Sequence, residues 1–444
     1  MVRSEELRIR TLAVALPVAL AVALVMLMGF GSSPAHADAT FTVNSTGDEN
    51  DLDFPAGVFD GSSDGKCDVS SGVAGDQCTL RAAIQEANLT LAPDTIRFGI
   101  PGSGVKTISP NSLLPVITEA VTITGYTQPG SSVNTSAKGT NAKLMIELDG
   151  ANVDNGSGGG LDIQASNVTV KGLVINGFRF IDSIIISPRT VSDVATNIRI
   201  EGNFLGTDPS GTQDVGNGDT GVFIFSGTSN TVGGTSLAAR NLISGNNSGG
   251  VYMQGDAGYG PSSNNVVQGN LIGTQRDGTS ALGNGDNGVT VAGFTSPDTG
   301  NRILSNSIAF NENLGIDLGD NGVTANDNLD PDVGPNLRQN FPEVTSATTT
   351  RRATTIVGTL NSTPNTTFTL QFFSSPQPDP SGFGEGQTFK VQKSVSTDNG
   401  GDGTFSFKLK RGKKIPVGQF VTATATDPQG NTSEFSAAVE VVLP

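Results

Sequence analysis

Residues 206–222 read GTDPSGTQDVGNGDTGV, and residues 273–289 read GTQRDGTSALGNGDNGV. The two stretches are identical at 10 of 17 positions, including GNGD at 216–219 and 283–286, and they lie 67 residues apart. Self-similarity at a fixed spacing indicates a repeat architecture, in which each unit buries its apolar face only by stacking on its neighbours. The rest of the chain should therefore cap, extend or tether a stack of repeats.

The spacing of Gly-aliphatic pairs gives the length of one repeat. Val222 and Val251 are 29 residues apart, Val251 and Val289 are 38 apart, and together these steps make the 67-residue offset. The period is therefore two coils, with the long turns on one side of the stack. A βα alternation would need helical stretches between the strands, and the pattern lacks them. We predict an all-β chain with a right-handed parallel β-helix over residues 94–340, since parallel crossovers are right-handed.

Short β runs separated by Gly and Asn support this prediction. They are expected at 95–100, 116–125, 143–149, 160–163, 167–175, 197–200, 221–225, 265–273, 288–292, 301–308 and 315–318. After residue 340 the strands become longer and alternate in polarity, at 341–344, 354–360, 366–373, 403–409, 420–426 and 437–442. About 100 residues of this pattern predict an immunoglobulin-like β-sandwich over 341–444.

The first 37 residues have the form of a secretory signal peptide. Arg3, Arg8 and Arg10 precede an apolar run from residue 12 to 30, and an Ala-His-Ala cleavage site ends at 37. The run is also long enough for an uncleaved membrane anchor, which is the alternative. We expect an exported protein, secreted or at the cell surface, with no membrane insertion after cleavage.

Composition excludes several classes of function. Cleavage removes the only histidine, His36, and leaves 23 basic and 40 acidic residues, a net charge of −17. Phosphate binding needs clustered Lys and Arg, so nucleic acid is not an expected partner. Without histidine, His-based acid–base chemistry and Ser-His-Asp or Cys-His catalysis are excluded.

Residues 38–93 are predicted to form an N-terminal cap. Cys67 and Cys78 are expected to form a disulfide, because the chain is exported. Leu80, Ile84 and Ala87 share one face of a short amphipathic helix that can cover the end of the stack, and Thr79 can be its N-cap. Acidic residues crowd the preceding loop at 48–68 and are a minor Ca²⁺ candidate.

The chain resembles a bacterial exported family named for its N-terminal CSLREA motif. The residues that carry the resemblance are FTVN (41–44), the Cys67/Cys78 pair, CTLRAAI (78–84), EAN (86–88), LPVIT (114–118), GYTQPG (125–130), GIDLGDNGVTAND (315–327), DVGPN (332–336) and NFPEV (340–344). Ala82 departs from the motif, which has Glu there. The resemblance implies a right-handed β-helix of the pectin-lyase-like superfamily and implies little about activity, because function does not follow from fold.

The repeated GNGD offers one catalytic hypothesis. Asp219 and Asp286 should lie two coils apart, at roughly 10 Å, near the upper carboxyl spacing of inverting glycosidases. Arg276 is a candidate base for a lyase that acts on a Ca²⁺-bound uronate. The alternative is turn chemistry, in which Gly supplies a positive φ and Asp bonds its own backbone.

Two further sets of residues have a structural and a functional interpretation. Asn203, Asn246, Asn270 and Asn306 predict either an asparagine ladder or a row that binds sugar, and a sugar platform should also use aromatic faces such as Tyr126, Tyr252 and Tyr259. Five carboxylates near the end of the β-helix predict either a Ca²⁺ site or a solvated loop; they are Asp317, Asp320, Asp327, Asp330 and Asp332.

The sequence thus favours a non-catalytic surface protein that contacts polysaccharides or other cell-surface components. The alternative is a Ca²⁺-dependent polysaccharide lyase or a carboxylate-pair glycosidase. A cleft with several acids and an Arg on one face of the coils would favour the enzyme, whereas a face of Asn, Ser, Thr and Val would favour the structural role.

Overall fold

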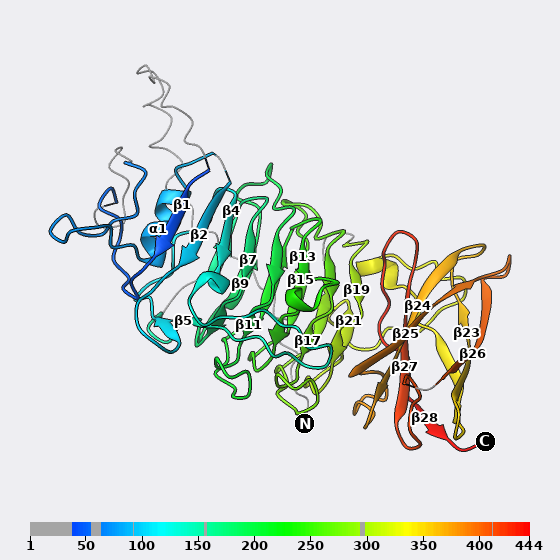
Figure 1. The fold of residues 1–444 in the computed structure, drawn as a ribbon. Coiled ribbons are helices and arrows are strands. Elements are labelled where there is room, and N and C mark those ends of the chain that lie inside the picture. The colour runs from blue at the N-terminus through cyan, green and yellow to red at the C-terminus, as the bar shows by residue number, and fades with distance from the viewer. Residues whose placement is uncertain (1–37, 55–63, 92, 155–157, 294–297, 411) are drawn as a thin grey trace, which may run out of the picture. The chain divides into compact units, whose positions relative to one another are not determined.

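The computed structural model describes residues 38–54, 64–91, 93–154, 158–293, 298–410 and 412–444 (Figure 1). The expected signal peptide at 1–37 lies outside the described residues. Among the described helices, none has the length and apolar character needed to cross a membrane.

In the described residues, three parallel sheets stack strand upon strand along the chain (Figure 1). Sheet A contains β1 (Thr40–Val43), β2 (Asp94–Phe98), β4 (Val121–Thr124), β7 (Thr169–Lys171), β10 (Arg199–Glu201), β13 (Thr231–Gly233), β16 (Val266–Gln268) and β19 (Arg302–Leu304). Sheet B contains β3 (Lys106–Ile108), β5 (Ile146–Asp149), β8 (Val174–Asn176), β11 (Phe204–Leu205), β14 (Leu242–Ile243), β17 (Leu271–Ile272) and β20 (Ser307–Ile308). Sheet C contains β6 (Gly159–Ile163), β9 (Asp182–Ile186), β12 (Val222–Phe225), β15 (Val251–Gln254), β18 (Val289–Val291) and β21 (Ile316–Leu318). The predicted right-handed parallel β-helix is confirmed.

The strand register confirms the two-coil period. Val222 pairs with Val251, and Val251 pairs with Val289, so the 67-residue offset spans two coils. All three valines are fully buried, as are their counterparts in the other sheets. The interior of the coil is therefore a stack of aliphatic side chains, which the Gly-Val phrases of the sequence mark.

Three of the predicted β runs contain a corner that the sequence analysis did not place. Runs 167–175, 265–273 and 301–308 each supply one strand to sheet A and the next to sheet B. The chain turns at Gly172, Gly269 and Ser305, whose φ angles are 76°, 73° and 53°. A left-handed residue ends each strand after a few residues, so aliphatic runs that look continuous are divided between two sheets.

The N-terminal cap has the predicted helix, α1 (Leu80–Ala87), with Thr79 as N-cap: the Thr79 hydroxyl accepts from the Ala82 N–H at 3.1 Å. Arg81 anchors α1 through a nearly buried ion pair with Asp48, 2.8 Å long. The predicted disulfide joins Cys67 and Cys78 with 5.0 Å between their Cα atoms.

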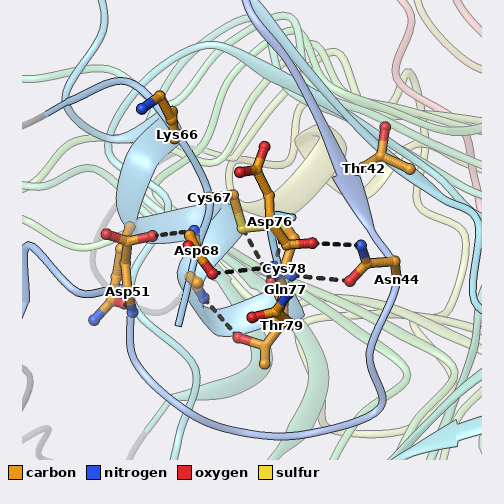
Figure 2. Close-up of a disulfide and its surroundings, with 12 residues drawn as sticks. Thr42, Asn44, Asp51, Lys66, Cys67, Asp68, Asp76, Gln77, Cys78 and Thr79 are labelled. Carbon is orange, nitrogen blue, oxygen red and sulfur yellow. Dashed lines mark hydrogen bonds between the residues drawn. A yellow bond between two sulfur atoms is a disulfide. The ribbon is translucent and has the colours of Figure 1, made fainter. Parts of the chain in front are cut away.

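Polar contacts fix the loop around this disulfide, with Asn44 and Asp51 on opposite sides of it (Figure 2). Asn44 accepts from the Cys78 N–H at 2.9 Å, and Asp51 accepts from the Asp68 N–H at 2.8 Å. The cap thus joins β1, α1 and the disulfide loop into one packed unit.

The C-terminal module is a seven-stranded sheet in the described part of the chain, ordered β25-β24-β27-β28-β22-β23-β26. Its strands are β22 (Glu343–Thr349), β23 (Thr354–Asn361), β24 (Thr367–Ser375), β25 (Thr388–Ser396), β26 (Asp402–Leu409), β27 (Phe420–Thr426) and β28 (Val439–Val442). The strand β25 was not predicted from the sequence; it is a largely exposed edge strand in which Phe389, Val391 and Val395 alternate with polar residues and Lys393 interrupts the pattern. The immunoglobulin-like assignment of the module stays a prediction.

The module satisfies backbone N–H groups of the last coil, once in each parallel sheet. Ile303 in sheet A, Ile308 in sheet B and Leu318 in sheet C donate to Thr432 Oγ1, the Gly386 carbonyl and Glu434 Oε1, at 3.1, 3.1 and 2.9 Å. The open end of a sheet presents unpaired N–H groups, so the module prevents end-to-end pairing of chains there.

Candidate functional site

Buried asparagines form three ladders at the corners of the coils. One ladder runs Asn203–Asn241–Asn270–Asn306, the second Asn217–Asn246–Asn284–Asn311, and the third Asn230–Asn265–Asn301–Asn336. Three of the four predicted residues share the first ladder, and Asn246 belongs to the second. The structural interpretation of these residues is confirmed, since their amides bond from coil to coil.

The GNGD acids occupy equivalent corners two coils apart. The Asp219 carbonyl accepts from the Ser248 N–H at 3.2 Å, and the Asp286 carbonyl accepts from the Asn313 N–H at 3.4 Å. Asp286 Oδ1 also accepts from Asn313 Nδ2 at 2.7 Å. A coil that carries Ser248 therefore separates the two aspartates.

The hydrogen bonds of Arg276 go to neighbouring loops and not to this pair of aspartates. Its guanidinium donates to the carbonyls of Thr140, Ala142 and Ser210 at 3.0 to 3.2 Å. Arg276 thus ties two neighbouring loops to its own, and its donors are engaged by the backbone.

The five carboxylates at 317–332 fall into two groups. Asp317 lies in β21 and Asp320 follows it, and Asn287 Nδ2 is 3.4 Å from an oxygen of the first and 3.5 Å from an oxygen of the second. The other three lie beside the C-terminal module, where Asp330 accepts from Gln339 Nε2 at 2.6 Å and from the Ser362 hydroxyl. The structure does not bring all five together around one point.

A different set of three carboxylates has the spacing of a cation site. Oxygens of Asp51, Asp53 and Glu86 all lie within 4.8 Å of one another, which no other His, Cys, Asp or Glu set among the described residues achieves. Burial raises the pKa of Asp51, although N–H donors from Asp53 and Asp68 oppose the rise. Glu86 was not among the acids predicted to bind Ca²⁺, because α1 supplies it from a separate part of the sequence.

Aromatic side chains gather on the outer face of sheet C. We call Phe223, Phe225, Tyr252 and Tyr259 the aromatic strip. Phe223 pairs in register with Tyr252, with ring centroids 5.6 Å apart, and Phe225 lies 5.6 Å from Tyr259. Their neighbours Val222 and Ile224 point inward and are fully buried, so strand alternation sets the aromatic rings outward.

Polar groups border the aromatic strip on the following coils. The strand register continues from Tyr252 to Thr290 and then to Asp317, which are 1% and 3% exposed. The Tyr252 hydroxyl donates to Asp320 Oδ2 at 3.1 Å, and burial raises the pKa of Asp317. One face thus combines aromatic rings with fixed amide and carboxylate groups, the composition that ligand sites share.

A groove of about 500 Å³ lies at the corner between sheets B and C. We call it the corner groove; its lining residues are Asp214, Gly245, Asn246, Asn247, Gly283, Asn284, Gly285, Phe310 and Glu312. It contains residues of both copies of the repeated phrase, but Asp214, Phe310 and Glu312 were not among the predicted site residues. Only the stacking of coils brings them together.

No family model and no curated protein matches the chain, so the CSLREA resemblance stays a prediction. The solved structures that are similar to it include two tailspike proteins. Tailspike protein 2 of Escherichia coli O157:H7 bacteriophage CAB120 has 10% identity over 79% of this chain, with a TM-score of 0.18, and the Dettilon tailspike protein has 13% identity over 84%, with a TM-score of 0.14. The matches cover 60% and 92% of those chains. The fold assignment rests on the strands and their register.

Proposed function

We propose that the protein is exported and contacts glycans, at the cell surface or outside it, through the aromatic strip. The observation that carries the proposal is the set of half-buried rings of Phe225, Tyr252 and Tyr259 on the outer side of sheet C, with Asp320 held beside the Tyr252 hydroxyl. Aromatic rings offer apolar faces for the C–H groups of a sugar, and adjacent fixed polar groups can bond its hydroxyls. The parallel coils hold these groups in a rigid row.

Catalysis is the second candidate, as a carboxylate-pair glycosidase or a Ca²⁺-dependent lyase. Asp317 and Asp320 favour it because one amide, that of Asn287, lies near both carboxylates, and glycosidases use two carboxyls about 5 to 9 Å apart. Binding is favoured over catalysis because Asp317 is only 3% exposed and accepts from the N–H groups of Asn321 and Gly322. A general acid needs access to its substrate.

The test is a binding and degradation panel with residues 38–444 and neutral and acidic polysaccharides, each with and without EDTA. We expect at least one polysaccharide to retard the protein in affinity electrophoresis. The double variant Phe225→Ala/Tyr252→Ala should lose this retardation. Phe180→Ala, at an aromatic residue that is 65% exposed and outside the strip, should keep it.

Two outcomes would oppose the proposal. Retardation that survives the double variant would remove the strip from the binding site. Release of sugar products would establish catalysis instead, and its loss in EDTA would make Ca²⁺ the required ion.

A further inference from the structure

The corner groove is lined by glycines, by ladder amides and by three other side chains. The glycines are Gly245, Gly283 and Gly285, the ladder residues are Asn246 and Asn284, and Asp214 comes from a different coil than Phe310 and Glu312. Asp214 Oδ1 lies so close to Gly245 that a Cβ there would meet it at 2.8 Å. At Gly283 and Gly285 a Cβ would meet the carbonyl oxygens of Phe310 and Asn247 at 1.9 and 2.5 Å, so these glycines let the coils stack closely beside the groove.

Phe310 stands where the preceding coils have glycine. Gly177, Gly216 and Gly245 have φ angles of 73°, 72° and 77° at the corner just before the second ladder or its equivalent, and Phe310 has a φ of 70°. A non-glycine residue in this region costs about 1 kcal/mol or more and is typical of functional sites. Phe310 is also 42% exposed, so burial of its ring does not explain why it replaces glycine.

The groove carries negative charge and no positive charge. Its described lining includes two carboxylates and no Lys, Arg or His. Within the described part of the chain, the carboxylates of Asp214 and Glu312 make no hydrogen bond or ion pair. Burial raises the pKa of Asp214. A cation beside either carboxylate would be held by Coulomb attraction, and one over the Phe310 ring would be held by the ring face.

We infer that the corner groove binds protonated amino groups of an amino-sugar polymer, such as a deacetylated hexosamine chain. The inference rests on the proposed glycan contact and specifies the glycan class for a second surface. The sugar ring packs on Phe310, ammonium groups on different sugars of the chain lie against Asp214 and against Glu312, and Asn247 offers an amide to sugar hydroxyls. An acidic polysaccharide would be repelled from the same groove.

The test compares oligosaccharides of equal length that differ only in N-acetylation. Calorimetry at about pH 5.5, where such amines are protonated, and about 0.15 M salt should give at least tenfold tighter binding of the deacetylated oligomer. A lysine tetramer of similar charge should bind at least tenfold more weakly than that oligomer, because it lacks the ring that packs on the aromatic side chain.

Variants locate the site without risking the fold. Phe310→Gly relieves the positive φ and removes the ring, so it should fold normally and bind at least tenfold more weakly. Asp214→Asn removes one groove charge and should weaken binding similarly. Glu440→Gln removes one charge from an exposed position of the C-terminal module and should leave binding unchanged.

Equal affinity for the two oligomers, unchanged binding by Phe310→Gly and Asp214→Asn, or a requirement for a divalent cation would each overturn the inference. The experiments distinguish a failure of the corner-groove inference from a failure of the proposed glycan contact at the aromatic strip. A neutral glycan that depends on the aromatic strip and not on the groove would keep the first proposal and reject this one. Binding of the amino-sugar oligomer that depends on the groove and not on the aromatic strip would keep the corner-groove inference and reject the strip as the glycan site.

Discussion

Replacing Asn270 by alanine should be among the most damaging polar substitutions in the β-helix. Asn270 is 1% exposed and lies inside the first ladder. Its amide nitrogen donates to the Val232 carbonyl at 2.9 Å and to Asn306 Oδ1 at 3.0 Å. Its oxygen accepts from the backbone and side-chain N–H groups of Asn241 at 3.3 and 2.9 Å.

The magnitude follows from the groups left without partners. Alanine at 270 leaves two N–H donors of Asn241 without a partner in a buried corner and removes the side-chain bond to the Val232 carbonyl. Each buried polar group that loses its partner costs about 1 to 3 kcal/mol, and partial relaxation makes the sum smaller. We expect the free energy of unfolding to fall by about 3 to 5 kcal/mol.

Urea denaturation followed by far-ultraviolet circular dichroism measures this loss. Asn313→Ala is the matched control, because Asn313 is exposed and its side chain makes a single bond, to Asp286. It should cost less than about 1 kcal/mol, as surface substitutions do. If Asn270→Ala destabilises the protein no more than the control does, the ladder does not hold the coils together as described.

Three further predictions concern stability. Burial raises the pKa of Glu385 and of Glu434 to about 7 from 4.5, so the folded chain holds these protons more tightly than the unfolded chain. The melting temperature should therefore be highest near pH 4 to 5 and fall as pH rises through 7. The double variant Glu385→Gln/Glu434→Gln should flatten that profile. Reduction of the Cys67–Cys78 disulfide should cost about 3 kcal/mol in the chain-entropy model, seen as faster proteolysis of the cap; equal rates with and without reductant would contradict it. Gly283→Ala would place a Cβ 1.9 Å from a carbonyl oxygen of the next coil and should lower the urea midpoint; an unchanged midpoint would show that the coils do not stack as closely as described.

The fold was predictable because its constraint is periodic. The Gly-Val steps at 222, 251 and 289 state the coil length directly, and stacking then determines the register. The corners were less predictable. Gly172 and Ser305 divide aliphatic runs between two sheets, and a glycine within a run looks the same whether it bends a strand or ends it.

The candidate surfaces were predictable only in part. Alternation in GVFIF (221–225) could have placed Phe223 and Phe225 outward, but pairing with Tyr252 depends on the coil register. Asp214 and Glu312 lie 98 residues apart and line the same groove only because the coils stack. The five carboxylates at 317–332 separated because nearby backbone N–H and hydroxyl groups hold them on different surfaces, a local geometry that their spacing does not encode.

Tyrosine fluorescence offers the most direct test of glycan contact at the aromatic strip. The chain has three tyrosines and no tryptophan, and Tyr126 lies elsewhere, donating to the Gly202 carbonyl at 2.7 Å. Adding an oligosaccharide that binds the protein should change the tyrosine emission until the binding sites are saturated. The change should persist in Tyr126→Phe and vanish in Tyr252→Phe/Tyr259→Phe, which keeps the rings and hence the binding measured by calorimetry. A change that survives the double variant and disappears with Tyr126→Phe would place the glycan away from the strip and contradict the account.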